Sequence, residues 1–97
     1  MFASVRRYRM DPLGVDELIT RVEQEFVPIV SKSPGFVAYY AVDAGNGIVT
    51  SISIFEDQKG AEQSSLAAAD WVGRRIASLL PTPPEITAGE VRVAKTR

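Results

Sequence analysis

The chain has 97 residues, of which 45% are hydrophobic and 24% are charged, and its formal net charge is −1. This length and composition predict one globular domain, residues 1–97. The absence of cysteine and histidine excludes disulfides, thiolate catalysis and histidine-ligated metal or haem sites. The near-neutral charge gives no reason to expect nucleic acid or an anionic membrane as a partner.

The amino terminus carries no targeting pattern. The opening MFASVRRYRM lacks a long apolar run before its arginines, so it does not resemble a secretory signal. No stretch of the sequence approaches the length of a transmembrane helix. We therefore expect a cytoplasmic protein.

The first two predicted elements are a strand and a helix. Residues 2–9 are rich in β-formers and are followed by a turn sequence, which predicts a strand. From about Leu13 to Val30, apolar side chains recur at helical spacing. Pro28 lies opposite this apolar stripe, so we expect it to bend the helix while its freed carbonyl partner faces water. The helix is expected to end at residues 33–35.

Two strands joined by a tight turn follow. Asn46-Gly47 favours a turn with positive φ, and a loop of either two or four residues gives the same pairing of faces. One predicted face holds Phe36, Ala38, Tyr40, Val42, Val49, Ser51, Ser53 and Phe55. The opposite face holds Val37, Tyr39, Ala41, Asp43, Thr50, Ile52 and Ile54. The first strand is therefore expected to be apolar on both faces.

A second helix is predicted from about Gln58 to Leu80, and a last strand over residues 86–94. The inward stripe of this helix has small side chains in its first half and large ones in its second: Ala61, Ser65, Ala68, Ala69, Val72, Ile76 and Leu79. The small residues either hold the helix off the sheet and leave a cavity, or let the helix pack closely against the sheet. The sequence leaves both interpretations open.

The order of elements is β-α-β-β-α-β. It predicts an α+β, ferredoxin-like fold with a four-stranded antiparallel sheet, in the order 4-1-3-2, and both helices on one face. The 36–43 strand would then lie on an edge, where two apolar faces are an aggregation hazard unless something covers them. We therefore predict a homodimer whose two sheets pack face to face. The alternative is a monomer with a somewhat apolar sheet face.

These features resemble a known family. The element order, the segments PGFVAYY and SISIFED, and AADWV on the second helix are similar to the antibiotic biosynthesis monooxygenase (ABM) domain of the dimeric α+β barrel superfamily. The resemblance covers nearly the whole chain and implies a ligand cleft between the helices and the sheet. The superfamily includes cofactor-free quinol-forming monooxygenases, haem-degrading enzymes and ligand-sensing domains, so the fold does not select a reaction. The haem degraders use a histidine and a first-strand asparagine, and this chain has neither.

The aromatic candidates are Trp71 and Tyr40. The resemblance implies that a tryptophan on the second helix can line the cleft, where the Trp71 indole would stack on a flat aromatic ligand and donate a hydrogen bond. The alternative role for Trp71 is a cap on the hydrophobic core. Tyr40 shares its predicted face with Ser51 and Ser53, where it would orient a ligand hydroxyl or hold a proton. The alternative for Tyr40 is packing at the dimer seam.

The basic and small candidates come from the first strand and the second helix. Alternation puts Arg7 and Arg9 on one face of the strand, where either would bind an anionic group or pair with a carboxylate. Ser53, Ser65 and Ala68 complete the predicted substrate-binding set. The carboxylates are scattered along the sequence and suggest no metal site.

The predicted function is that of a cofactor-independent monooxygenase for a small aromatic or quinol-type substrate, with Trp71, Tyr40 and Arg7 as catalytic residues. In such chemistry the electron-rich substrate reacts with O2 itself, and the protein supplies shape, desolvation and a proton-handling group. No cofactor is expected. The alternative, from another class, is a dimer that binds a small ligand without catalysis, or a structural module.

Overall fold

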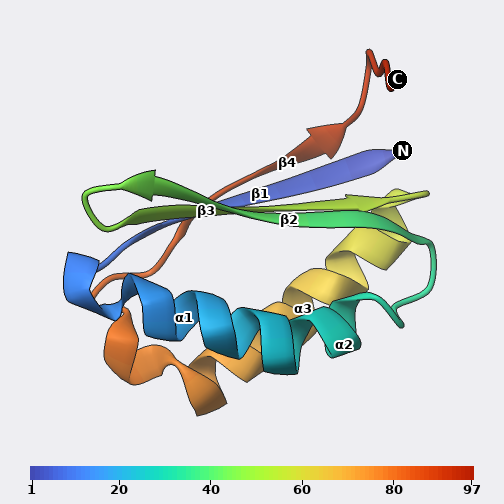
Figure 1. The fold of residues 1–97 in the computed structure, drawn as a ribbon. Helices are drawn as coiled ribbons and strands as arrows, with labels where there is room; N and C mark the ends of the chain where they lie inside the picture. Colours follow the sequence, from blue (N-terminus) through green and yellow to red (C-terminus); the bar gives the residue numbers. More distant parts are fainter.

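The computed structural model describes all residues, 1–97, and the elements follow the predicted order (Figure 1). The strands are β1 (Phe2–Arg9), β2 (Phe36–Gly45), β3 (Ile48–Phe55) and β4 (Glu85–Glu90). The helices are α1 (Val15–Arg21), α2 (Val27–Val30) and α3 (Gln58–Arg75). All pairings are antiparallel and the sheet order is β2-β3-β1-β4, which confirms the predicted ferredoxin-like topology and puts β2 on an edge.

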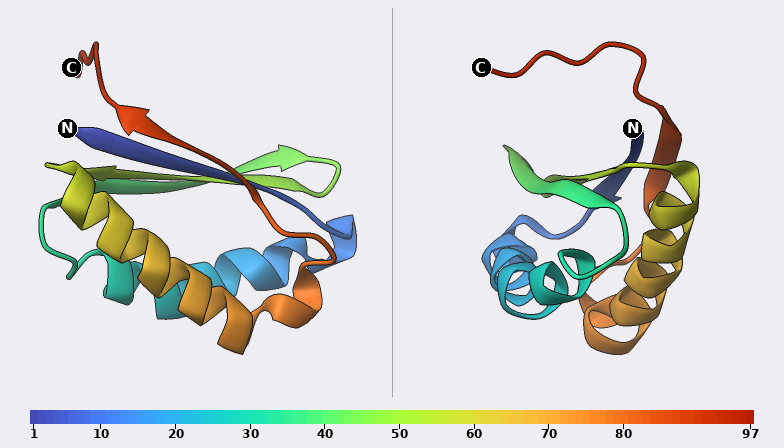
Figure 2. Two further views of the ribbon diagram at one scale, coloured as in Figure 1. Left: turned by 180° about the vertical axis from the view of Figure 1, so that it is seen from behind. Right: turned by 90° about the vertical axis from the view of Figure 1, so that its right-hand side faces the viewer.

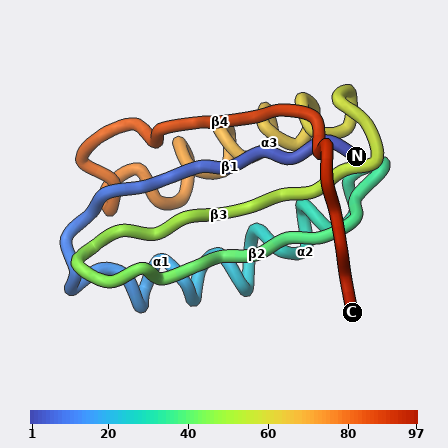
Figure 3. Tube along the Cα trace, turned by 90° about the horizontal axis from the view of Figure 1, so that it is seen from above, coloured from blue at the N-terminus to red at the C-terminus, as the bar shows by residue number.

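The molecule has two layers, and the helices cover only one face of the sheet. Figures 1 and 2 show the helices packed beneath the strands, with α1 and α2 toward the β2 side and α3 toward the β4 side. The residues after β4 cross the sheet on its other side (Figure 3). None of the helices combines the length and the apolar composition that crossing a bilayer requires.

The turn between β2 and β3 is the predicted one, but β2 contains two irregularities. Asn46-Gly47 has φ angles of 56° and 80°, as a two-residue hairpin turn requires. The pairing with β3 then shifts register within residues 43–45, and it shifts again within residues 36–38. Each shift adds an unpaired residue to β2, as in a β-bulge, and so reverses the faces to which the following side chains point.

These bulges correct the predicted faces of β2. Tyr39 pairs with Ser53 and Ala41 pairs with Ser51, so these residues share the helix-facing side. Tyr40 pairs with Ile52 on the free face of the sheet. Ala38 and Val42 lie on the same face and pair with other residues of β3. The prediction that Tyr40 lies with Ser51 and Ser53 was therefore wrong. Tyr39 takes that place.

The first helical segment widens into a π turn between α1 and α2, at Val22–Phe26. Pro28 has no N–H to donate, and its ring would clash with the carbonyl four residues earlier in a regular α-helix. The N–H of Val27 instead donates to the carbonyl of Val22, five residues back, so a wider turn accommodates the proline. Pro28 is exposed, as the apolar stripe predicted, and the expected bend takes the form of this π turn.

The buried face of α3 is rotated relative to the predicted stripe. Asp57 caps the helix by accepting a hydrogen bond from the N–H of Gly60 at 2.8 Å. The buried side chains beyond the first turn are Ala61, Ser64, Ala68 and Trp71, whereas Ala69, which was predicted to face inward, is exposed. Trp71 is thus central to the packed face.

Two glycines of the hairpin provide a matched test of the turn. Gly45 and Gly47 both have positive φ angles, of 84° and 80°. A Cβ on Gly45 would meet nothing within 4 Å, whereas a Cβ on Gly47 would lie 2.0 Å from the carbonyl oxygen of Met10. The Met10 N–H also donates to the carbonyl of Gly47 at 2.9 Å, so the two backbones cannot easily separate.

We expect Gly45→Ala to lower the free energy of unfolding by about 1 kcal/mol through backbone strain alone. Gly47→Ala should lower it by more than about 3 kcal/mol, because the clash adds to the same strain. Urea unfolding of both variants measures the difference. Equal losses in the two variants would contradict the close approach of Gly47 to Met10.

Candidate functional site

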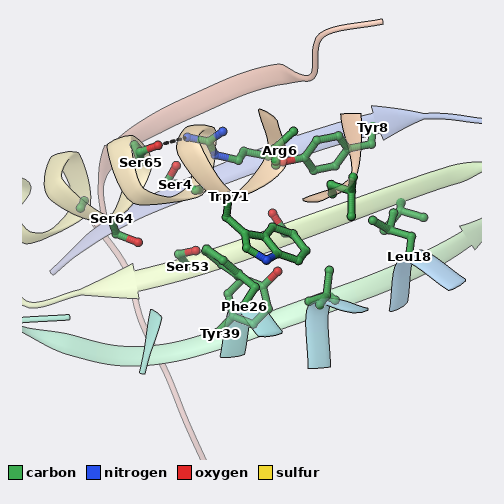
Figure 4. A pocket seen from close by; sticks show the side chains of 18 of the residues that line it. Ser4, Arg6, Tyr8, Leu18, Phe26, Tyr39, Ser53, Ser64, Ser65 and Trp71 are labelled. Carbon is green, nitrogen blue, oxygen red and sulfur yellow. Dashed lines mark hydrogen bonds between the residues drawn. The ribbon is translucent and has the colours of Figure 1, made fainter. Parts of the chain in front are cut away.

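A cleft lies between the helices and the sheet, beneath β1 and β3 (Figure 4). Five of its 19 lining residues are serines, and Arg6 is its only charged residue. The lining residues are Ser4, Arg6, Tyr8, Leu18, Val22, Phe26, Tyr39, Ala41, Val49, Ser51, Ser53, Phe55, Ala61, Ser64, Ser65, Ala68, Trp71, Val72 and Ile76. The small residues of α3 therefore do border a cavity, which settles the alternative that the sequence left open.

Two cavities flank the first half of α3. The cleft encloses about 30 Å³, which is room for a few water-sized groups and less than the roughly 150 Å³ that holds a benzene ring. A more open groove of about 280 Å³ lies on the other side, lined by Phe2, Ser4, Ala61, Glu62, Ser65, Leu66 and Ala88. Ser4, Ala61 and Ser65 border both cavities, so this part of α3 and β1 forms the wall between them.

The structure divides the predicted site residues into two groups. Trp71, Ser53, Ser65 and Ala68 all line the cleft. Tyr40, Arg7 and Arg9 do not: Tyr40 is 59% exposed on the free face of the sheet, and both arginines are exposed on the opposite side of β1 from the buried Ser4, Arg6 and Tyr8. Within one chain, Arg6 and Tyr39 occupy the places predicted for Arg7 and Tyr40.

Three aromatic side chains form the wall of the cleft opposite β1. The rings of Phe26 and Trp71 are 5.3 Å apart between centroids, and those of Phe26 and Tyr39 are 5.5 Å apart in an edge-to-face arrangement. Phe26 belongs to the π turn that Pro28 imposes, so a proline on the exposed side of the helix determines an aromatic wall on the buried side. The sequence analysis did not identify Phe26 because its helical spacing marks it as ordinary core.

Trp71 is held by a carboxylate from the same π turn. Glu25 accepts a hydrogen bond from the Trp71 indole N–H at 3.3 Å and an ion-paired hydrogen bond from Arg75 Nε at 2.7 Å. The hydrogen bond from Arg75 lowers the pKa of the Glu25 carboxyl, and the bond from Trp71 and the charges of Arg75 and Arg21 add to this effect. Because its N–H is already committed, Trp71 presents its ring rather than a donor to the cleft.

The two tyrosines of the cleft are neutral phenols at ordinary pH. Burial raises the pKa of Tyr39 to about 12, although the hydroxyl of Ser51 and the charge of Arg6 partly oppose the shift. Burial likewise raises the pKa of Tyr8, again against the influence of Arg6. Neither phenol is therefore a base in this setting. Both can donate or accept a hydrogen bond.

The polar end of the cleft is built on β1. Arg6 is 9% exposed, and its Nη2 donates to the backbone carbonyl of Ser65 at 3.1 Å (Figure 4). Two residues earlier on the same face of the strand, Ser4 is 5% exposed and its Oγ has no hydrogen-bond partner. A sequence signal for these residues existed, because β1 alternates and Arg6 shares the parity of the apolar Phe2, Tyr8 and Met10.

Tyr39 makes stability depend on pH in the alkaline range. The unfolded chain loses this phenolic proton near pH 10, whereas the folded protein keeps it to about pH 12. The unfolded state then binds fewer protons, so stability falls as pH rises through this window. Between about pH 9 and about pH 11, wild-type protein should lose roughly 1 kcal/mol more stability than Tyr39→Phe.

Leu13→Ala serves as the matched control, because Leu13 is 93% exposed and carries no ionisable group, so it should leave the alkaline loss unchanged. Urea unfolding at the two pH values measures all three proteins. Equal alkaline losses in wild type and Tyr39→Phe would show that the Tyr39 hydroxyl is not buried in the cleft.

Comparisons with known proteins identify the fold. No protein-family model matches the chain, and no curated protein matches it. Among solved structures, a monooxygenase from the gene ActVA-Orf6 of Streptomyces coelicolor, in complex with nanaomycin D, is 19% identical, with a TM-score of 0.81 over 99% of this chain and 91% of that one. The haem degrader MhuD of Mycobacterium tuberculosis, with two haems bound, is 17% identical, with a TM-score of 0.77 over 99% and 100%.

A protein of unknown function from Nitrosomonas europaea, NE2512, is 22% identical, with a TM-score of 0.77 over 99% of this chain and 93% of that one. At these identities the comparisons establish the architecture. The chain therefore has the α+β fold of the antibiotic biosynthesis monooxygenases and of MhuD, as the resemblance in its sequence predicted.

Proposed function

We propose that the protein is a cofactor-independent monooxygenase that acts on a small aromatic or quinol-type substrate in the cleft. The observation that carries this proposal is a buried cleft with an aromatic wall of Phe26, Tyr39 and Trp71 facing serine hydroxyls. Such a wall suits a flat ring, and the hydroxyls suit its oxygen substituents. The shared fold with a monooxygenase that binds nanaomycin D supports the same substrate class.

The proposed reaction draws all its electrons from the substrate. For anthrone as a probe, the methylene carbon of the central ring, opposite the carbonyl, loses a proton. The resulting electron-rich anion reacts with O2. One oxygen atom becomes the second carbonyl of anthraquinone, and the other leaves as water with the two hydrogens that the carbon loses. Four electrons pass from substrate to O2. No external reductant is needed.

The side chains of the cleft would supply position and desolvation. Trp71 and Phe26 would stack on the ring, and Glu25 would fix the indole in that orientation. Ser53, Ser65 and the phenol of Tyr39 would hydrogen-bond to ring oxygens, while Ala68 leaves space for the ring. The proton would leave to solvent, because no carboxylate or imidazole lines the cleft.

A substrate ring requires more space than the cleft encloses. The wall of the cleft that can move outward is α3. Its first half faces the sheet with Ala61, Ser64 and Ala68, which offer little apolar contact, and the open groove lies on its other side. An outward movement of this half would enlarge the cleft and would break the hydrogen bond from Arg6 to the Ser65 carbonyl. The second half is tied to the π turn through Trp71, Arg75 and Glu25.

Haem does not suit this cleft, although MhuD shares the fold. The chain has no histidine or cysteine to ligate iron. The phenols of Tyr8 and Tyr39 are poor substitutes, because burial raises the pKa of both and keeps them protonated. No cluster of three or more acidic, histidine or cysteine side chains gathers elsewhere for another metal.

The proposed assembly is a homodimer through the free face of the sheet. Tyr40 and Val42 of the edge strand β2 are 59% and 44% exposed there, beside the half-buried Ile52 and Ile54 of β3. No helix of the chain covers this face (Figure 1). A second copy would bury it by two-fold packing of sheet on sheet.

The activity test incubates the purified protein with anthrone and follows both O2 uptake and anthraquinone formation. We expect saturable turnover with one O2 consumed per quinone, and Trp71→Phe should lower kcat/KM by about tenfold, because the ring contact weakens by roughly 1.4 kcal/mol. Leu13→Ala, at a 93% exposed position that does not line the cleft, should have no effect. Absence of turnover together with saturable thermal stabilisation by the same compounds would favour the non-catalytic ligand-binding alternative.

The dimer test measures mass in solution by light scattering. Wild-type protein should have the mass of two chains at micromolar concentration. Ile52→Lys places a charge at the centre of the free face, between Val5 and Tyr40 on the neighbouring strands, and should yield the mass of one chain. Leu13→Lys adds the same charge outside that face and should stay dimeric. A monomeric wild type would refute the assembly.

A further inference from the structure

The buried cation of the cleft has no counter-charge within the chain. Arg6 is 9% exposed and carries a guanidinium cation. None of the ion pairs of the structure involves it, and no aspartate or glutamate is among the residues that line the cleft. The groups that it contacts are neutral: its Nη2 donates to the backbone carbonyl of Ser65, and the Tyr8 phenol interacts with it.

An unpaired buried charge is costly, so buried charges in proteins are normally paired. The two nearby phenols cannot supply the missing charge, since burial raises the pKa of Tyr8 and of Tyr39. A second copy of the chain on the free face cannot supply it either, because Arg6 lies on the opposite, helix-facing side of β1. The remaining source of a negative charge is a ligand.

Ser4 is an independent sign of a missing partner at the same place. Its Oγ is the only buried side-chain polar atom without a hydrogen bond. Ser4 and Arg6 are neighbours on one face of β1, and both line the cleft (Figure 4). A hydroxyl donor beside a guanidinium fork matches a planar group with two anionic oxygens.

We propose that Arg6 and Ser4 form a carboxylate-binding subsite, so that the ligand of this cleft is an aromatic carboxylate. The proposal rests on the proposed function only in placing the ligand's ring against Phe26 and Trp71. Arg6 binds the carboxylate through its guanidinium, and Ser4 donates its hydroxyl to one of the oxygens. Arg6 is then the residue that selects charged aromatic ligands over neutral ones of the same shape.

The test compares naphthoate with naphthamide, which have nearly the same shape but differ in charge. Binding is measured by fluorescence quenching of Trp71, the single tryptophan of the chain and part of the cleft, and by calorimetry. Wild-type protein should bind naphthoate at least about tenfold more tightly than naphthamide. Arg6→Met keeps most of the side-chain volume but removes the charge, and should reduce this ratio to about one.

Two further variants keep the result interpretable if Arg6→Met folds poorly. Arg6→Lys retains the charge without the fork and should keep a reduced preference for naphthoate. Arg74→Met removes the same charge from an exposed helical position and should keep the full preference. Ser4→Ala should weaken naphthoate binding several-fold and leave naphthamide binding unchanged.

A wild-type ratio near one, or an undiminished ratio in Arg6→Met, would overturn the subsite. Neither probe is a quinol, so these outcomes are independent of the monooxygenase assay. Naphthoate binding without anthrone turnover would retain the subsite and reject the proposed reaction. Anthrone turnover with no preference for the carboxylate would retain the reaction and reject the subsite.

Discussion

The pairing of β2 with β3 is the constraint on which both surfaces of this sheet depend. Two register shifts, one on each side of the central part of β2, turn Tyr39 toward the helices and Tyr40 away from them. Without the shifts the two tyrosines would exchange places, and an exposed phenol would replace part of the aromatic wall of the cleft. The bulges therefore determine at once what lines the cleft and what the free face offers to a partner.

A second constraint comes from Pro28, which acts on the opposite side of the helix from the cleft. The π turn that accommodates it brings Phe26 against Trp71 and Tyr39, and brings Glu25 within hydrogen-bond distance of the indole and of Arg75. In a regular α-helix, the side chains of Phe26 and Glu25 would point in other directions around the helix axis than they do in the π turn. Helix and sheet thus both depart from regular geometry where the cleft is built, the helix at one π turn and the sheet at two bulges, as is common at functional sites.

The topology could be predicted from sequence because it depends on periodicity and turn chemistry, which are local. The helical stripe from Leu13 to Val30, the Asn46-Gly47 turn and the strand order were all recovered from these signals. The face of the sheet on which Tyr40 lies could not be predicted. A bulge adds one residue to the strand and so reverses the faces of the residues beyond it, and the side chains of β2 are apolar on both faces, so their pattern does not mark the reversal. The residue that comes nearest to signalling a bulge is Gly45, which has a positive φ and lies next to one of the two bulges.

The choice among the first-strand arginines was a different kind of error, since the information was present. Arg6 shares the parity of the buried residues of β1, whereas Arg7 and Arg9 both lie on the opposite face and are exposed. A buried arginine is informative because the fold gains nothing from it: an apolar side chain of similar size would pack there at lower cost.

The same reasoning applies to the small and polar residues of the cleft as a group. Serines at positions 4, 51, 53, 64 and 65 occupy sites where larger apolar side chains would bury more surface and stabilise the chain. The apolar residues that hold the domain together form one cluster, which includes Leu18, Val30 and Phe55 and extends to the wall of the cleft. A core weakened at its centre in this way gains from any contact that a ligand or a second sheet contributes.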